Sequence, residues 1–338
     1  MLHSALMDVL VYEGPREMNM RRAEIPKPEP DEILIRVEKA GICGSELSGY
    51  LGHNSLRVPP LVMGHEFAGT VAALGADVSA FRPGDRVTVN PLVSCRRCRS
   101  CVEGRPQLCE RRAIVGVHRP GAFAEYVAVP AASAYALPGE LSVDAATLTE
   151  PFACAIHAVR QAGLDPADRL LVYGGGPIGL LVLLAARAFG LERVTVMELN
   201  RNRLDIADAL GAVAVGSEEA LRAAAPAGGY DAVVDAVGVC ATRQQSVLNA
   251  RPGGTVVFSG LHEAKSPLPI NVAIRNEVTL KGAFCYDDRD FETALRWLGE
   301  GKADLTPWLQ HIPLSEGKAG FERLLGDPGP VAKIMLSI

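Results

Sequence analysis

The chain has 338 residues, more than one hydrophobic core usually supports, so we expect two domains. Its net charge of −5 is mild and Lys and Arg form no long run, which argues against nucleic acid or an anionic membrane as a partner. The longest apolar stretch, 178–186, is too short to span a bilayer. Segment 1–12 lacks the features of a signal peptide, so the eight cysteines predict metal binding in a soluble cytoplasmic protein and not disulfides.

The first ninety or so residues predict short β-strands separated by turns. We expect strands at 6–12, 32–39, 67–73 and 85–90, with a later one at 127–129. Prolines at positions 26, 28 and 30 prevent regular pairing between the first two strands. This half of the chain therefore predicts an antiparallel β-barrel.

Three side chains on the expected loops of this barrel are possible metal ligands: Cys43, His65 and Glu66. A thiolate, an imidazole and a carboxylate suit Zn²⁺, and three protein ligands leave a fourth position open to water or substrate, as in a catalytic site. Neighbouring glycines would let the backbone crowd around the ion. The simpler interpretation is that Cys43 is a buried core residue and that His65 and Glu66 are an exposed pair without a metal. Neither Cys43 alone nor the His65-Glu66 pair alone excludes it.

Four closely spaced cysteines form the sharpest local pattern in the chain: Cys95, Cys98, Cys101 and Cys109. Four thiolates can surround one tetrahedral Zn²⁺ and leave no open position, so this pattern predicts a structural zinc in a lobe at about 91–112. An iron–sulfur cluster is the less favoured alternative. Cys154, Cys240 and Cys285 have no partner at metal spacing and are expected to be buried packing residues.

A helical pattern begins at 144–146 and is expected to end at Glu150-Pro151. The composition changes there from β to alternating β and α, which predicts a hinge between two domains. Glu150 could bind the zinc as a fourth ligand, hold a zinc-bound water, or form an ordinary interdomain salt bridge. The sequence leaves these three roles open.

The second domain begins with a dinucleotide-binding pattern. A buried strand at 169–173 is followed by a glycine turn, a helix at 180–190, and a strand at 193–197 that ends in Glu198. The helix N-terminus would hold a pyrophosphate, and Glu198 would accept hydrogen bonds from the adenosine ribose. The residues expected to contact the cofactor at the turn are Gly174, Gly176, Pro177, Ile178 and Gly179.

The remaining elements alternate between strand and helix, which predicts a parallel, doubly wound sheet of the Rossmann type. After Tyr286 the chain returns to mixed structure, with a helix at 290–299 and a last strand at 331–336. We therefore predict an α/β protein with a catalytic domain at 1–151, a nucleotide-binding domain at 152–286, and a C-terminal return to the catalytic domain at 287–338.

The order of these motifs resembles the zinc-dependent medium-chain alcohol and polyol dehydrogenases, with sorbitol and L-threonine dehydrogenases most similar in pattern. The resemblance covers the whole chain. It implies a GroES-like β-barrel catalytic domain, a Rossmann domain binding NAD, one catalytic and one structural zinc, and a homotetramer or homodimer. The segments that carry it are 41–45, 64–66, 84–87, the four-cysteine lobe, Glu150-Pro151, 174–179, 235–238 and 332–336.

One departure from the family pattern affects the proton relay. The family commonly has histidine where this chain has Ser48, and Glu46 replaces the usual aspartate. Ser45 is the expected acceptor of the substrate's hydroxyl proton. His53 is a candidate to replace the missing histidine at the end of the relay, where the proton passes to solvent. The resemblance also places a basic residue at Arg203 beside Glu198 without a change in the preference for NAD.

A carboxylate among the zinc ligands resembles the polyol and threonine branches of the family. We therefore predict oxidation of a secondary hydroxyl of a polyol, sugar or cyclitol, with L-threonine 3-dehydrogenase as the first alternative. A zinc-free enone or quinone reductase of the same fold is a second alternative, which the presence of Cys43, His65 and Glu66 argues against. The last alternative is a non-catalytic protein that kept the fold. Such a protein would be expected to lack the metal ligands or the glycine turn, and this sequence has both.

Overall fold

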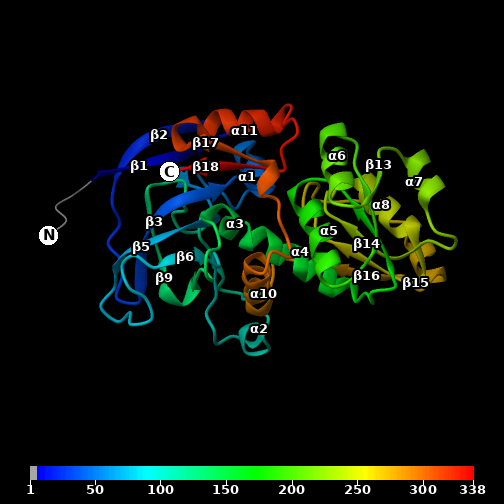
Figure 1. Ribbon diagram of the computed structural model, residues 1–338, viewed down its shortest axis with the longest axis horizontal. Helices are drawn as coiled ribbons and strands as arrows, with labels where there is room; N and C mark the ends of the chain where they lie inside the picture. Colours follow the sequence, from blue (N-terminus) through cyan, green and yellow to red (C-terminus); the bar gives the residue numbers. More distant parts are fainter. Residues whose placement is uncertain (1–5) are drawn as a thin grey trace.

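Strands from both ends of the chain, antiparallel in all pairings but one, form the first lobe, drawn at the left of Figure 1. The structure is a computed structural model that describes residues 6–338, so the first five residues of the expected catalytic domain and of segment 1–12 lie outside the described part. A three-stranded sheet has the order β2 (Glu17–Glu24), β1 (Leu6–Gly14), β4 (Leu61–Val62). The larger sheet has the order β10 (Ala134–Ala136), β6 (Arg86–Val89), β5 (Glu66–Leu74), β3 (Glu32–Gly41), β18 (Lys333–Ser337), β17 (Leu309–Pro313), with β9 (Tyr126–Pro130) also paired to β3.

Two strand pairings in this lobe place residues beside the predicted zinc ligands. Glu66 lies opposite Gly41 where β5 pairs with β3, and Met335 of β18 lies opposite Gly41 on the other side. The helix α11 (Gly317–Leu325) packs near α1 (Gly44–Tyr50). The last strand of the chain is therefore next to the strand that leads into Cys43.

The second lobe is a parallel six-stranded sheet covered by helices, at the right of Figure 1. Its strand order is β13 (Val213–Val215), β12 (Arg193–Met197), β11 (Arg169–Tyr173), β14 (Tyr230–Asp235), β15 (Ala250–Phe258), β16 (Thr279–Gly282), and every pairing is parallel. Its helices are α5 (Pro177–Ala188), α6 (Arg201–Ala209), α7 (Glu218–Ala224), α8 (Cys240–Asn249) and α9 (Ile270–Arg275). The predicted fold class, a β-barrel lobe and a doubly wound parallel sheet, is confirmed.

The helix α4 (Thr149–Ala162) lies between the two lobes and packs against α5 and α10 (Asp288–Gly299) (Figure 1). The prediction that a helix ends at Glu150-Pro151 is wrong. A short helix, α3 (Val143–Thr147), ends just before, and Pro151 lies in the first turn of α4. A proline is tolerated there because the first helical N–H groups have no partner within the helix.

Ion pairs fix α4 to the start of α10. His157 Nδ1 lies 2.7 Å from the Asp290 carboxylate, and Arg160 pairs with both Asp290 and Asp287. Asp290 has no exposed surface, so its two basic partners supply the charge compensation that a buried carboxylate needs. No helix in the part of the chain that the structure describes is long and apolar enough to cross a membrane.

The four-cysteine lobe is a short excursion with little regular structure. It contains β7 (Leu92–Val93), paired with β8 (Ala113–Ile114), and the single-turn helix α2 (Arg99–Val102). None of the α2 residues is buried, so apolar packing contributes little to holding this turn in place.

A buried carboxylate also joins three strands of the parallel sheet. Asp231 on β14 accepts hydrogen bonds from Arg169 Nε (3.0 Å) on β11 and Arg251 Nε (2.6 Å) on β15. Its side chain is 11% exposed. Burial alone would raise the pKa of Asp231, but the hydrogen bonds from Arg251 and Arg169 lower it to about 2.

We expect Asp231→Asn to lower the free energy of unfolding by about 1–2 kcal/mol at pH 7, since both arginines lose a charged acceptor. The pKa of Asp231 is lower in the folded state, so this stabilisation is present above about pH 4 and is lost as the pH falls toward 2. Thermal unfolding between pH 7 and pH 3 measures it, with the exposed Arg201–Asp205 pair tested by Asp205→Asn as the control. An equal loss in both variants would contradict the assignment.

Candidate metal and cofactor site

The structure brings Cys43, His65 and Glu66 together where β3 ends and β5 begins. Their ligand atoms all lie within 4.8 Å of one another, although the residues come from two separate loops. Cys43 caps the N-terminus of α1, while His65 and Glu66 are buried at the start of β5. A sulfur, a ring nitrogen and a carboxylate oxygen at this separation could hold one Zn²⁺ with a position left for another ligand.

The fully buried carboxylate of Glu46 holds these loops together. Glu46 Oε1 lies 2.8 Å from His65 Nδ1 and accepts a hydrogen bond from the Gly64 N–H (2.9 Å), while Oε2 accepts one from the Cys43 N–H (3.0 Å). Burial favours the neutral acid, but the nearby His65 and Arg57 overcome it and lower the pKa of Glu46. Because Nδ1 of His65 is engaged by Glu46, Nε2 is the ring nitrogen left to bind a metal.

Glu66 is paired with a lysine that sequence reasoning did not single out. Lys333 Nζ on β18 lies 2.6 Å from Glu66 Oε2 and donates a hydrogen bond to the Ile42 carbonyl (3.1 Å), and both side chains are almost completely buried. Glu66 Oε1 has no hydrogen-bond partner within residues 6–338. A buried acceptor without a partner is costly, and a bound cation would supply what it lacks.

Glu150 lies beside this cluster but outside the three-residue group. Cys154 Sγ is 3.9 Å from Glu150 Oε1, and the buried hydroxyl of Tyr286 also faces this carboxylate. Burial raises the pKa of Glu150 to about 7; the Glu66 carboxylate adds to the shift, and His65 opposes it. Burial likewise raises the pKa of the Cys154 and Cys285 thiols, which keeps them neutral.

Ser45 is connected to Cys43 on one side and to an arginine on the other. Its Oγ donates to Cys43 Sγ (3.4 Å) and accepts from Arg57 Nη2 (3.1 Å). His53, the candidate relay exit, is exposed, and its proposed role stays a prediction. Arg57 was missed because no sequence pattern marks an arginine that turns inward from a loop.

The four lobe cysteines lie within 4.8 Å of one another. Cys101 Sγ lies 4.0 Å from Cys95 Sγ and 3.5 Å from Cys98 Sγ. Four sulfurs bound to one zinc at ~2.3 Å would be ~3.8 Å apart, so these residues fit a closed tetrahedral site. Hydrogen bonding, first from the backbone N–H of Arg97, lowers the pKa of the Cys95 thiol to about 5, which favours a thiolate ligand.

A third group with possible metal ligands, His157, Asp287 and Asp290, is better explained as an ion-pair network. Arg160 pairs with both of its carboxylates and so supplies the positive charge that a metal would bring. We therefore assign no metal ion to this group.

The glycine turn between β11 and α5 has two positions at which the local geometry favours glycine. Gly174 has φ 97°, and a Cβ on Gly179 would lie 1.8 Å from the Gly174 carbonyl, so neither position accepts another residue without a shift. Glu198 accepts hydrogen bonds from the N–H groups of Gly175 (2.7 Å) and Asn200 (2.8 Å). The hydrogen bond from Gly175 joins the loop after β11 to the loop after β12, although the two loops are more than twenty residues apart in the sequence.

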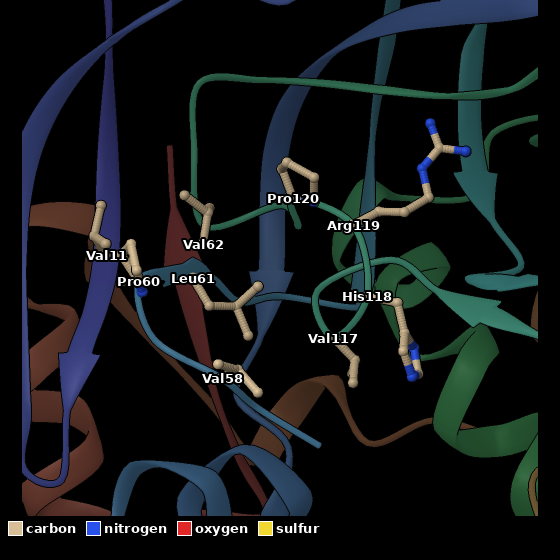
Figure 2. A pocket seen from close by; sticks show the side chains of 9 residues that line it. All are labelled: Val11, Val58, Pro60, Leu61, Val62, Val117, His118, Arg119 and Pro120. Carbon is tan, nitrogen blue, oxygen red and sulfur yellow. The ribbon is translucent and has the colours of Figure 1, made fainter. Parts of the chain in front are cut away.

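Figure 2 shows an apolar hollow on the barrel lobe that is separate from this site. Its volume is about 440 Å³ and its walls come from β1, β4 and two loops. The lining residues are Val11, Val58, Pro60, Leu61, Val62, Val117, His118, Arg119 and Pro120. Since Cys43, His65 and Glu66 are not among them, the hollow is not the candidate metal site.

The role of the Glu46 carboxylate in holding the metal ligands can be tested by substitution. We expect Glu46→Gln to weaken zinc binding at the Cys43 site by about 10- to 100-fold, because one amide cannot accept all the hydrogen bonds of a carboxylate. Zinc retained per chain during a chelator titration, measured by mass spectrometry, would show the loss. The four-cysteine site, which Glu46 does not contact, is the internal reference, and unchanged retention at both sites would contradict the assigned role.

Comparison with known proteins places these residues in a family. Residues 29–139 match the alcohol dehydrogenase GroES-like domain and residues 177–300 match the zinc-binding dehydrogenase domain. Similar proteins include "Probable D-xylulose reductase A" of Aspergillus clavatus (34% identity, covering 94% of each chain) and L-galactonate-5-dehydrogenase of Escherichia coli K12 (34%, covering 94% of this chain and 95% of the relative). A zinc-binding dehydrogenase structure from Sinorhizobium meliloti 1021 bound to NADP is also similar (TM-score 0.91, 31% identity, covering 99% of this chain and all of that one). The chain therefore belongs to the zinc-dependent alcohol and polyol dehydrogenase family and is a nicotinamide-dependent oxidoreductase.

Proposed function

We propose that this enzyme oxidises a secondary hydroxyl of a polyol, sugar, sugar acid or cyclitol to a ketone and transfers the hydride to NAD. The observation that carries the proposal is the contact between Ser45 and Cys43 within a cluster that includes a carboxylate ligand. The names of the relatives, a xylulose reductase and a galactonate dehydrogenase, support a polyhydroxylated substrate. A homodimer or homotetramer stays a prediction from the family resemblance.

We assign Cys43, His65 and Glu66 as ligands of a zinc ion, with Glu150 beside the fourth position. When bound, zinc acts as a Lewis acid that lowers the pKa of a substrate hydroxyl. The chain's own residues would orient this hydroxyl and take its proton. We assign Ser45 Oγ as its acceptor, and the contact of Ser45 Oγ with Cys43 Sγ, an assigned zinc ligand, supports this role.

The glycine turn and Glu198 would hold the dinucleotide. The N–H groups at the start of α5 face the pyrophosphate position, and Gly176 leaves room for the phosphate to approach. A Cβ on Gly176 would lie 3.9 Å from Arg203 Nη1, and Arg203 Nε is buried without a partner within residues 6–338. We assign Arg203 to the pyrophosphate side of the site, where it would act on NAD and NADP alike.

Two zinc ions per chain are expected, one in each ligand set. Cys43→Ala should remove one ion and abolish turnover with the fold retained, since an open site contributes little to folding. Cys98→Ala should instead lower the yield of soluble protein, because a closed site contributes folding energy directly. Metal analysis and melting temperature measure both effects, with Cys240→Ala as the matched control. A single zinc in fully active enzyme would disprove the count.

NAD should be preferred over NADP because Glu198 would face the 2′-phosphate of NADP. Two negative charges at ~4 Å repel by ~4 kcal/mol at an effective dielectric near 20, about three powers of ten in affinity. Glu198→Ala should weaken NAD binding and narrow or invert the preference, while exposed Glu219→Ala should change neither. The measurement is kcat/KM with each cofactor, and parity or a lead for NADP in the wild type would overturn the assignment.

A further inference from the structure

The loop after α1 has one charged side chain turned inward between two apolar side chains turned outward. Leu56 is 57% exposed and Val58 is 68% exposed, but Arg57 is only 5% exposed. Val58 points into the apolar hollow of Figure 2, whereas Arg57 extends back toward the site. This is the reverse of the usual order, in which apolar side chains are buried and arginine is exposed, so the inward position of Arg57 calls for a partner.

The space for Arg57 is provided by a glycine in α1. A Cβ on Gly49 would lie 2.3 Å from Arg57 Cδ, so any other residue there would displace the side chain. The guanidinium has five N–H donors, yet within residues 6–338 only Nη2 donates a hydrogen bond, to Ser45, and buried Nε has no acceptor.

No carboxylate within residues 6–338 forms an ion pair with Arg57. Glu46 is close enough for Arg57 to lower its pKa, but both of its oxygens are already engaged by other donors. A buried cation without an anionic partner is unfavourable, and proteins keep such groups where a ligand completes them.

The guanidinium is also next to the reacting position. Arg57 Nη2 is 3.1 Å from Ser45 Oγ, which is 3.4 Å from Cys43 Sγ. Because Ser45 is exposed, the end of the guanidinium contacts a side chain that solvent can reach. A substrate hydroxyl at the metal position would therefore bring its neighbouring carbon atoms within reach of Arg57.

We propose that Arg57 binds a carboxylate of the substrate, so that the preferred substrate is a polyhydroxy acid oxidised at a hydroxyl a few carbons from its carboxylate. This assignment rests on the proposed function, because it names the substrate class for the same site. A guanidinium matches a planar carboxylate with two parallel hydrogen bonds. One guanidinium balances the single charge of a carboxylate but not the nearly double charge of a phosphate monoester.

The test compares aldonates of four to six carbons, the corresponding alditols, and a hexitol 1-phosphate as substrates of the zinc-loaded enzyme with NAD and NADP. Wild type should prefer aldonates. Arg57→Met should lower kcat/KM for aldonates by about 10- to 100-fold, mostly through KM, because a charge-assisted contact to a remote group is lost. Alditols should change by less than about threefold, and Arg57→Lys should recover part of the preference.

A second readout needs no turnover. Aldonates should bind the wild-type complex with NADH, followed by nicotinamide fluorescence, at least ten times more tightly than alditols, and Arg57→Met should remove the difference. The control is Arg22→Met, an exposed arginine on β2. If Arg57→Met does not fold, the role of Arg57 is decided by the substrate preference of Arg57→Lys and by the relative affinities of the wild type for aldonates and alditols.

Equal losses for aldonates and alditols, or a wild-type preference for alditols or the phosphate ester, would overturn the role of Arg57 and leave the dehydrogenase assignment standing. Absence of turnover with all three classes, and with free sugars and cyclitols, with either cofactor would overturn the proposed function itself.

Discussion

The buried carboxylate of Glu46 is the interaction on which the site depends. It accepts hydrogen bonds from the Cys43 N–H after β3 and the Gly64 N–H before β5, and it contacts the ring of His65, so two loops 21 positions apart are held together. The pairing of β3 with β5 brings these loops to the same end of the sheet. Without Glu46, the Cys43 and Gly64 N–H groups would lose their shared acceptor, and the pairing of β3 with β5 would remain to hold the two loops beside each other.

The carboxylates of the candidate metal site are opposed by few cations within residues 6–338. Lys333 pairs with Glu66, while Glu150 forms no ion pair in this part of the chain. A divalent cation held by Cys43, His65 and Glu66 would add positive charge to this buried region. Burial, with the neighbouring Glu66 carboxylate adding to it, raises the pKa of Glu150 to about 7. Burial alone would lower the pKa of Lys333, but its carboxylate partner Glu66 outweighs this effect and raises it.

The parts that sequence reasoning predicted well are those encoded by short spacing. The cysteines of the lobe and the glycine turn lie within a few residues of each other, so their geometry follows from local chain properties. The helix around Pro151 was predicted wrongly because a proline disfavours helix in the residue before it, which suits a helix end as well as a first turn. Lys333 and Arg57 could not be identified, since their roles arise from tertiary contacts that no local pattern records.

Strand β18 lies beside β3, and its Lys333 pairs with Glu66, which lies 267 positions earlier in the chain. During synthesis, Glu66 therefore emerges long before Lys333, the cation with which it pairs. The nucleotide-binding sheet, whose strands are contiguous in the chain, can form before Lys333 emerges. The charge balance of the candidate metal site thus depends on β18, and a chain truncated before Lys333 would lack both an inner sheet strand and the cation that pairs with Glu66.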